Sequence, residues 1–267
     1  MSFRTNRFGG AELVPFPKRR DLGASAGRPE TRLPVLVILH QESSTPGRVG
    51  NALRALGHRL DIRRPRFGDP VPETLEQHAG AVVFGGPMSA NDSDDYIRRE
   101  IDWIEIPLRE QRPFLGICLG AQMLAMQLGA RVAPHADALT QIGYYPIRPT
   151  AAGHALCPDW PARVYHWHRE GFELPAGAEL LAEGDDFPVQ AFRTGNAFGV
   201  QFHPDVTYAM MHCWTTRGYD GLSAPGARAR HHHFTDRAVY DVAERAWLDH
   251  FIDGWLARRS VLAQAAE

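Results

Sequence analysis

Short β-rich apolar runs alternate with helical stretches through the first half of the chain, and this alternation limits the possible folds. Three apolar runs predict buried strands at residues 34–40, 79–86 and 112–118. Each is followed by a stretch whose apolar side chains have helical spacing, at residues 47–57, 91–110 and 119–130. Alternating β and α units of this length predict an α/β fold in which a mainly parallel sheet carries helices on both faces.

The second half of the chain changes character. Short strands are predicted at residues 142–149, 162–168, 188–193 and 197–203, with the last two joined as a hairpin. These strands predict an antiparallel extension of the sheet. A final amphipathic helix is expected from about residue 235 to 259. Its expected packing residues are Val239, Val242, Trp247, Phe251 and Trp255.

Domain organisation follows from where the periodic patterns begin. Residues 1–31 mix Gly, Pro, Arg and Ser without hydrophobic periodicity, which is typical of a flexible arm. From there on the patterned segments follow one another without an internal repeat. We therefore expect a single domain over residues 32–260.

Composition excludes several classes of protein. A formal net charge of −2 gives no electrostatic basis for binding nucleic acid or an anionic membrane, and no apolar run suits a membrane span. Three widely spaced cysteines favour a reducing compartment, so we expect a cytoplasmic protein. Lys18 is the only lysine, which argues against a phosphate-loop or Schiff-base lysine. Any ATP-driven step would then belong to another chain.

Cys118 lies in the sequence Gly116-Ile117-Cys118-Leu119-Gly120, between a predicted strand and a predicted helix. The pattern G-x-C-x-G is the cysteine counterpart of a serine nucleophile elbow, in which small neighbours allow a sharp turn. A helix N-terminus favours the thiolate, and the N–H of Leu119 can stabilise an oxyanion. A buried structural cysteine in a tight turn is the alternative interpretation.

A nucleophilic thiol needs a base, and His203 is the candidate because it ends a predicted strand just as Cys118 does. Strand ends of a parallel sheet meet at one edge, where active sites form. Asp205 lies two residues on, and in an extended segment it points the same way as His203 and can orient its ring. Gly85 and Gly86 follow another predicted strand, so a second N–H can reach the same edge.

The ordered motifs GGP, GICLGAQ and HPD, with FGGPMSA, YHWH and QAFRTGNAFGVQFHP around them, resemble the class I (triad) glutamine amidotransferase family. The resemblance covers roughly residues 35 to 210 and implies a flavodoxin-like α/β fold. It also implies Cys118 as the nucleophile, His203 as base and acid, and Asp205 as the partner of the histidine.

The resemblance further implies an oxyanion hole formed by the N–H groups of Gly86 and Leu119. It implies that Gln122 contacts the bound glutamine, with Gly85 and His168 also lining the substrate. Two positions depart from the family pattern. Asp205 stands where the family usually has glutamate, and Gln141 stands where a glutamate is common.

The activity implied is hydrolysis of glutamine, or of another γ-glutamyl compound, through a thioester on Cys118, with no cofactor and no metal. An ammonia-accepting synthetase subunit is the implied protein partner. The alternatives are a γ-glutamyl peptidase acting alone and a non-catalytic regulatory module of the same fold. A cysteine-elbow α/β-hydrolase is less favoured because its triad acid precedes the histidine.

Two histidine groups raise the further alternative of a metal hydrolase. His166 and His168 flank Trp167 on a predicted strand, so both rings face one side, as zinc ligands can. The favoured interpretation is that they line the substrate cleft or satisfy backbone groups. The His-His-His run at 231–233 is interpreted as a solvated helix start, because adjacent side chains diverge in direction.

Overall fold

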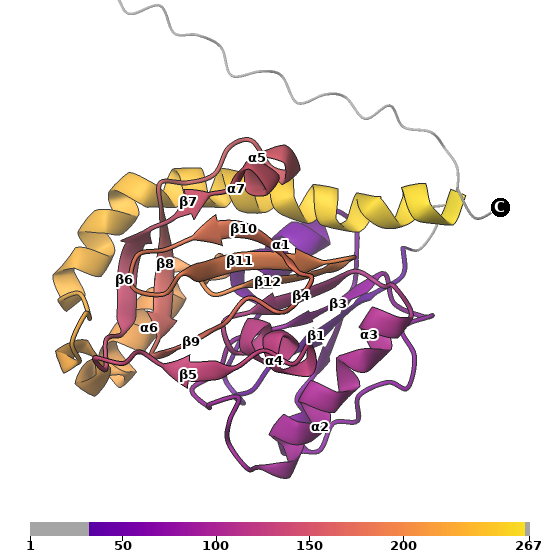
Figure 1. The fold of residues 1–267 in the computed structure, drawn as a ribbon, viewed down its shortest axis with the longest axis horizontal. Coiled ribbons are helices and arrows are strands. Elements are labelled where there is room, and N and C mark those ends of the chain that lie inside the picture. Colours follow the sequence, from indigo (N-terminus) through magenta and orange to yellow (C-terminus); the bar gives the residue numbers. More distant parts are fainter. Residues whose placement is uncertain (1–31, 265–267) are drawn as a thin grey trace, which may run out of the picture. The chain divides into compact units, whose positions relative to one another are not determined.

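The computed structural model describes residues 32–264, so the predicted arm at 1–31 lies outside the described residues. Its centre is an eight-stranded sheet (Figure 1) in the order β2-β1-β3-β4-β12-β11-β10-β7. The strands are β2 (Leu60–Arg63), β1 (Val35–Ile38), β3 (Gly80–Val83), β4 (Phe114–Ile117), β12 (Ala197–Val200), β11 (Val189–Thr194), β10 (Glu179–Glu183) and β7 (Arg148–Pro149). The first five strands in this order are parallel to one another. Each of the last three, β11, β10 and β7, is antiparallel to the strand before it in this order. The predicted parallel sheet with an antiparallel extension is confirmed.

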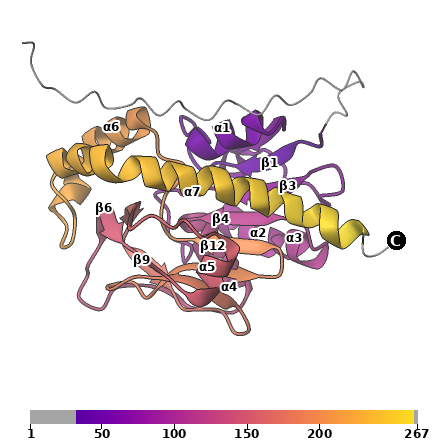
Figure 2. The ribbon, with the colours of Figure 1, turned by 90° about the horizontal axis from the view of Figure 1, so that it is seen from above.

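Helices cover both faces of this sheet. They are α1 (Gly47–Ala55), α2 (Asp95–Trp103), α3 (Glu105–Arg109), α4 (Leu119–Gln127), α5 (Ala151–Leu156), α6 (Tyr208–Arg217) and α7 (Arg230–Gln264), with 3-10 turns at Pro65–Phe67 and Tyr219–Ser223. Alternate residues of β1 enter different cores. Val35 and Val37 pack with α1 and α7, whereas Leu36 and Ile38 pack with α2 and α4. Figure 2 shows α7 running beside α1.

Two short sheets lie outside the central one. Strand β6 (Gln141–Pro146) pairs with β8 (Arg163–His168), and β5 (Val132–Pro134) pairs with β9 (Glu170–Phe172). The predicted strands at 142–149 and 162–168 therefore mainly pair with each other. Only β7, at the end of the first, joins the central sheet. This arrangement places β8 beside α7 and beside the segment that follows β12.

Some element predictions were wrong in detail. Strand β2 was missed because its residues, LDIR, are half-buried at the sheet edge and lack an apolar run. The predicted helix at 91–110 is two helices, α2 and α3, that meet at Ile104. No described helix is both long and apolar enough to cross a membrane.

The face that α7 buries also differs from the prediction. Trp247, Phe251 and Trp255 are buried as expected, but Val239 and Val242 are 68% and 76% exposed. In the first half of α7 the inward positions are held by polar side chains, so the apolar pattern there indicated the wrong face.

The histidine run does begin the final helix, which starts at Arg230. Its third member, His233, is buried rather than solvated, and its Nδ1 lies 2.9 Å from the hydroxyl of Tyr165.

Candidate active site

Three neighbouring strands bring the predicted site residues to one edge of the sheet. Strands β3, β4 and β12 are adjacent and parallel, so their carboxyl ends lie side by side (Figure 1). The glycine pair follows β3, Cys118 follows β4, and His203 follows β12. This is the edge at which open α/β sheets bind their ligands.

Cys118 occupies a strained turn. Its φ is 50° and its ψ is −105°, which a non-glycine residue rarely adopts, and it directly precedes α4. The flanking glycines are required by space: a Cβ on Gly116 would lie 2.4 Å from the carbonyl oxygen of Gly120. A Cβ on Gly120 would lie 2.1 Å from the carbonyl oxygen of Val83. Cys118 is buried, with an exposed fraction of 5%.

His203 lies between the thiol and a carboxylate. Its Nδ1 is 3.2 Å from Oδ1 of Asp205, and its backbone N–H donates to the carbonyl of Tyr165 at 2.7 Å. The ring of Trp214 contacts it edge-on, with centroids 5.0 Å apart. Burial lowers the pKa of His203, but the hydrogen-bonded Cys118 and Asp205 raise it by more, to about 10. The ring therefore carries a proton at neutral pH, the state that favours a thiolate beside it.

The glycine pair after β3 lies directly against this dyad. A Cβ on Gly85 would lie 2.5 Å from Cε1 of His203 and 3.4 Å from Cβ of Cys118. Within residues 32–264, the N–H of Gly86 has no hydrogen-bond acceptor. Leu119 is the first residue of α4, where N–H groups have no acceptor inside the helix. Two N–H groups without a protein acceptor among residues 32–264 thus belong to the residue after Cys118 and to the residue after Gly85, which packs against Cys118.

Behind the dyad is a buried group of neutral polar side chains. The ring nitrogens of His166 and His168 share a hydrogen bond at 3.1 Å, and Nδ1 of His168 donates to the carbonyl of Glu170 at 3.0 Å. Burial and the neighbouring His203 lower the pKa of His168 to about 3, so it stays neutral. Gln122 donates to the same carbonyl at 3.0 Å.

These contacts leave His168 with both ring nitrogens engaged by the protein. The described residues contain no group of three or more His, Cys, Asp or Glu that could hold a metal ion. Gln141 lies opposite His168 in the β6–β8 pair, and its amide oxygen accepts from Gln190 at 3.2 Å.

Glu170 is a candidate site residue that the sequence analysis missed. Its backbone carbonyl anchors Gln122 and His168, and its half-buried carboxylate accepts from the hydroxyl of Ser89 at 3.0 Å. The signal was present, because an acidic residue lies two positions after the strand that carries His166 and His168. A carboxylate in this position can pair with an ammonium group.

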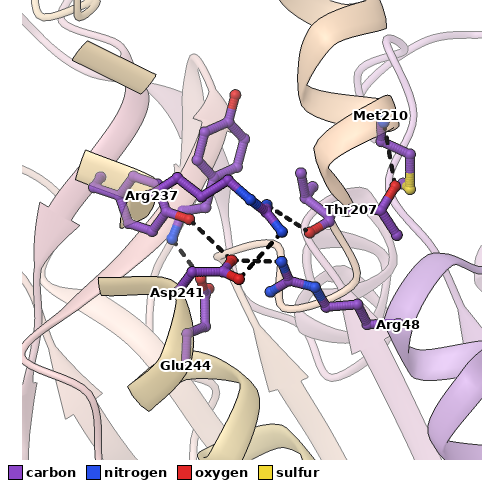
Figure 3. Close-up of polar contacts among 9 residues, drawn as sticks. Arg48, Thr207, Met210, Arg237, Asp241 and Glu244 are labelled. Atoms are coloured by element: carbon purple, nitrogen blue, oxygen red, sulfur yellow. Dashed lines mark hydrogen bonds and ion pairs between the residues drawn. The ribbon is translucent and has the colours of Figure 1, made fainter. Parts of the chain in front are cut away.

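Helix α7 holds the segment that carries Asp205 through an ionic cluster (Figure 3). Asp241 pairs with Arg48 of α1 and with Arg237, the latter at 3.1 Å. The backbone N–H of Arg48 donates to the carbonyl of Asp205 at 2.9 Å, and the Arg237 guanidinium donates to the carbonyl of Val206 at 3.4 Å. The cluster thus ties α1 and α7 to Asp205 and Val206, the second and third residues after the histidine.

A second α7 residue, Glu244, acts on the strand beside the histidine. Its carboxylate accepts the backbone N–H of Tyr165 at 3.1 Å, and the carbonyl of Tyr165 in turn accepts the N–H of His203. Sequence analysis missed Asp241 and Glu244, because residues so distant from the HPD motif carry no local signal.

Comparison with known proteins explains this geometry. The model of the family "Glutamine amidotransferase class-I" matches residues 38–212, most of the chain. The chain belongs to the class I glutamine amidotransferase family. The matched region includes all of the predicted site residues and ends before α7.

Sequence relatives include glutamine amidotransferase-like protein YfeJ of Salmonella typhimurium, 31% identical over 180 residues, which are 64% of this chain and 74% of that protein. GMP synthase of Thermomicrobium roseum is 32% identical over 177 residues, 64% of this chain. The matched region spans only 32% of that synthase.

Two solved structures share the fold. A glutamine amidotransferase from Thermotoga maritima superposes with a TM-score of 0.71 at 28% identity, covering 85% of this chain and 97% of that one. One from Methylobacillus flagellatus has a TM-score of 0.77 at 24% identity, covering 84% and 94%. The flavodoxin-like fold that the motifs implied is therefore confirmed.

Proposed function

We propose that this chain is a cysteine amidohydrolase that releases ammonia from glutamine. The observation that carries the proposal is the set of contacts at the sheet edge. Cys118 stands on a left-handed turn at the start of α4, the ring of His203 lies against the same glycine, Gly85, as Cys118 does, and this ring is hydrogen-bonded to Asp205. A thiol, a base and an orienting acid in this order form a nucleophilic triad.

In the first half-reaction the Cys118 thiolate attacks the side-chain amide carbon of glutamine. The C–S bond forms, and the carbonyl oxygen becomes an oxyanion that accepts hydrogen bonds from the N–H groups of Gly86 and Leu119. Protonated His203 then gives its proton to the leaving nitrogen as the C–N bond breaks. Ammonia leaves, and a glutamyl thioester remains on Cys118.

The second half-reaction is hydrolysis of the thioester. His203, now neutral, takes a proton from water, and the resulting hydroxide adds to the thioester carbon at the same oxyanion hole. The C–S bond breaks, glutamate leaves, and His203 again carries the proton that stabilises the thiolate. Asp205 keeps the ring oriented through both halves.

Substrate contacts follow from the groups that remain available. The amide oxygen of Gln122 and the carboxylate of Glu170 are suited to the α-ammonium group of glutamine. Gly85 leaves room for the substrate side chain beside the thiol. His168 contributes by holding the carbonyl of Glu170, since both of its nitrogens are engaged.

The ammonia acceptor is a separate synthetase subunit in this proposal. Support comes from the relatives named GMP synthase (glutamine-hydrolysing), of which this chain matches only about a third. Hydrolysis of a γ-glutamyl amide or peptide by the chain alone is the alternative, and so is a regulatory module without turnover.

The test is release of ammonia or amine from glutamine and a panel of γ-glutamyl amides, with Cys118→Ala alongside the native chain. We expect turnover of glutamine that Cys118→Ala abolishes, with Cys213→Ala, which removes a partly exposed thiol outside the triad, as the matched control. Turnover only of γ-glutamyl amides would make the chain a peptidase. No turnover together with a thiol that resists iodoacetamide would reject catalysis.

A further inference from the structure

A buried ion pair lies on the far side of the glycine pair from the thiol. His40 follows β1 and Glu100 lies on α2, and Nε2 of His40 is 2.8 Å from Oε2 of Glu100. Both side chains are shielded from solvent, with exposures of 0% and 1%. Replacing such a pair with apolar residues is often neutral or stabilising, so its presence needs a reason other than stability.

The position of Glu100 makes the pair more unusual. It lies on the stripe of α2 that otherwise packs apolar side chains such as Ile97 and Trp103 into the core. Its second carboxylate oxygen, Oε1, is buried and has no hydrogen-bond partner among the described residues. A carboxylate is kept here at a desolvation penalty, and its one polar contact is His40.

The other nitrogen of His40 reaches the glycine pair. Nδ1 lies 3.2 Å from the carbonyl oxygen of Gly85, and since a carbonyl only accepts, Nδ1 must carry the proton. The contact of Nε2 with Glu100 then holds the ring in place. The His40 side chain also packs against Gly86, where an added Cβ would lie 3.0 Å from Cβ of His40 and 3.2 Å from its ring atom Cγ.

The Gly85–Gly86 peptide needs such a restraint. Both residues must be glycine, because a Cβ at Gly85 would strike His203 and one at Gly86 would crowd His40 and Leu119. Glycine is also the residue with the greatest backbone freedom, so the peptide plane can rotate unless something fixes it. In a trans peptide the carbonyl of Gly85 and the N–H of Gly86 point in opposite directions.

We propose that His40 and Glu100 are positioning residues that hold the Gly85–Gly86 peptide with its N–H directed at the oxyanion. By binding the carbonyl from behind, His40 turns the opposite N–H toward Cys118, and Glu100 keeps His40 in that orientation. This inference rests on the proposed amidohydrolase function. It adds two residues, from β1 and α2, that no motif of the family pattern contains.

The test compares variants on two reactions of the same thiol. The double variant His40→Leu/Glu100→Leu removes both charges, so no unpaired ion is left in the core. We expect its kcat/KM for glutamine to fall about 10-fold to 100-fold, up to the effect of losing one oxyanion donor. Its rate of alkylation by iodoacetamide should stay within about 2-fold of native, because that displacement forms no oxyanion.

Two further variants separate positioning from folding. His40→Asn keeps an N–H donor at the place of Nδ1 and should recover most of the lost kcat/KM. His78→Leu is the matched control, since it removes another buried histidine, one paired with Asp61 at 3.0 Å near the opposite end of β3. It should leave kcat/KM unchanged. Equal losses of turnover and alkylation in the double variant would overturn the inference.

A second probe distinguishes this inference from the proposed function. Glutamate γ-semialdehyde should add to the native thiol as a thiohemiacetal, whose oxygen occupies the oxyanion hole, and so protect Cys118 from iodoacetamide. We expect the aldehyde concentration that halves the alkylation rate to be at least 10-fold higher for the double variant than for the native chain. If the native chain shows turnover and protection, and the double variant shows both to the same extent, only the inference is rejected. A native thiol that alkylates but shows neither turnover nor protection would reject the proposed function, and the inference with it.

Discussion

Glu244 is a carboxylic acid that α7 carries into the interior, close to the triad. It is fully buried, and burial raises its pKa to about 8. The charged groups that face it are Arg48 of α1, Asp241 of α7 and Asp205 after β12. Only the N–H of Tyr165 and the positive charge of Arg48 favour its ionised form, so Glu244 is mostly protonated at neutral pH.

The proton on Glu244 should make the free energy of unfolding depend on pH. Between the unfolded pKa of 4.5 and about 8, the folded chain keeps a proton on Glu244 that the unfolded chain has lost. The free energy of unfolding therefore falls as pH rises through this range. Glu244→Gln carries no such proton but keeps a carbonyl for the N–H of Tyr165. We expect its Tm, relative to native, to rise steadily from about pH 5 to pH 9 when followed by calorimetry.

The matched control is Glu105→Gln, which alters an exposed glutamate on α3. Its Tm should stay parallel to that of the native chain across the same range. Parallel profiles for Glu244→Gln as well would show that Glu244 is ionised in the fold and would contradict its assigned state.

Helix α7 lies outside the matched family region, which ends at residue 212. Its Asp241 bridges Arg48 and Arg237, which bind two successive backbone carbonyls: the N–H of Arg48 donates to Asp205 and the guanidinium of Arg237 donates to Val206. The helix thus acts on the triad through backbone position, without touching the reacting atoms. Asp241 is mostly buried, at 18% side-chain exposure. Its loss should therefore lower the free energy of unfolding more than the loss of a surface charge would.

We predict that Asp241→Asn lowers both stability and turnover. Two poorly hydrated guanidinium groups lose their carboxylate, which should reduce the free energy of unfolding by about 1–3 kcal/mol. The loosened Asp205 should lower kcat for glutamine about 10-fold with little change in KM, because orientation of the base matters mainly in the transition state. Denaturant unfolding and steady-state kinetics measure the two effects.

Glu179→Gln is the control, because it breaks a partly exposed pair with Arg193 on the antiparallel edge of the sheet. It should change the free energy of unfolding by less than about 1 kcal/mol and leave kcat unaltered. A destabilised Asp241→Asn with native kcat would limit the cluster to a structural role.

How far the elements could be predicted depended on burial. Strands β1 and β3 are buried on both faces and appear as the unbroken apolar runs VLVI and GAVV. Edge strand β2 has half-buried polar residues and gave no such run. In α7 the apolar pattern correctly predicted the packing around Trp247. It failed where Asp241 and Glu244 point inward, because hydrophobic periodicity does not detect polar side chains that make tertiary contacts.

At the site, sequence patterns indicated residues at turns but not those that support them. Cys118 and the glycine pair are visible because a turn of this kind needs glycine and leaves a motif. His40 follows β1 and Glu100 lies on α2, and neither local sequence indicates that the two side chains form a pair. Glu170 could have been found, because it lies two residues after the histidine-bearing strand.

For the whole molecule, the central claim is that Cys118 carries the glutamyl group between two half-reactions. The match covers about a third of the GMP synthase of Thermomicrobium roseum, and we propose a separate subunit as the ammonia acceptor. The chemistry within this chain can nevertheless be examined without that acceptor, because the thioester forms before any ammonia is used.

The most direct measurement is the mass of the Cys118 peptide after the native chain is mixed with glutamine, or with an activated γ-glutamyl anilide, and quenched in acid. We predict a glutamyl adduct on that peptide, which decays on further incubation before the quench and is absent in Cys118→Ala. Release of ammonia without an adduct on Cys118, or an adduct on Cys157 or Cys213 instead, would contradict the assignment of the nucleophile.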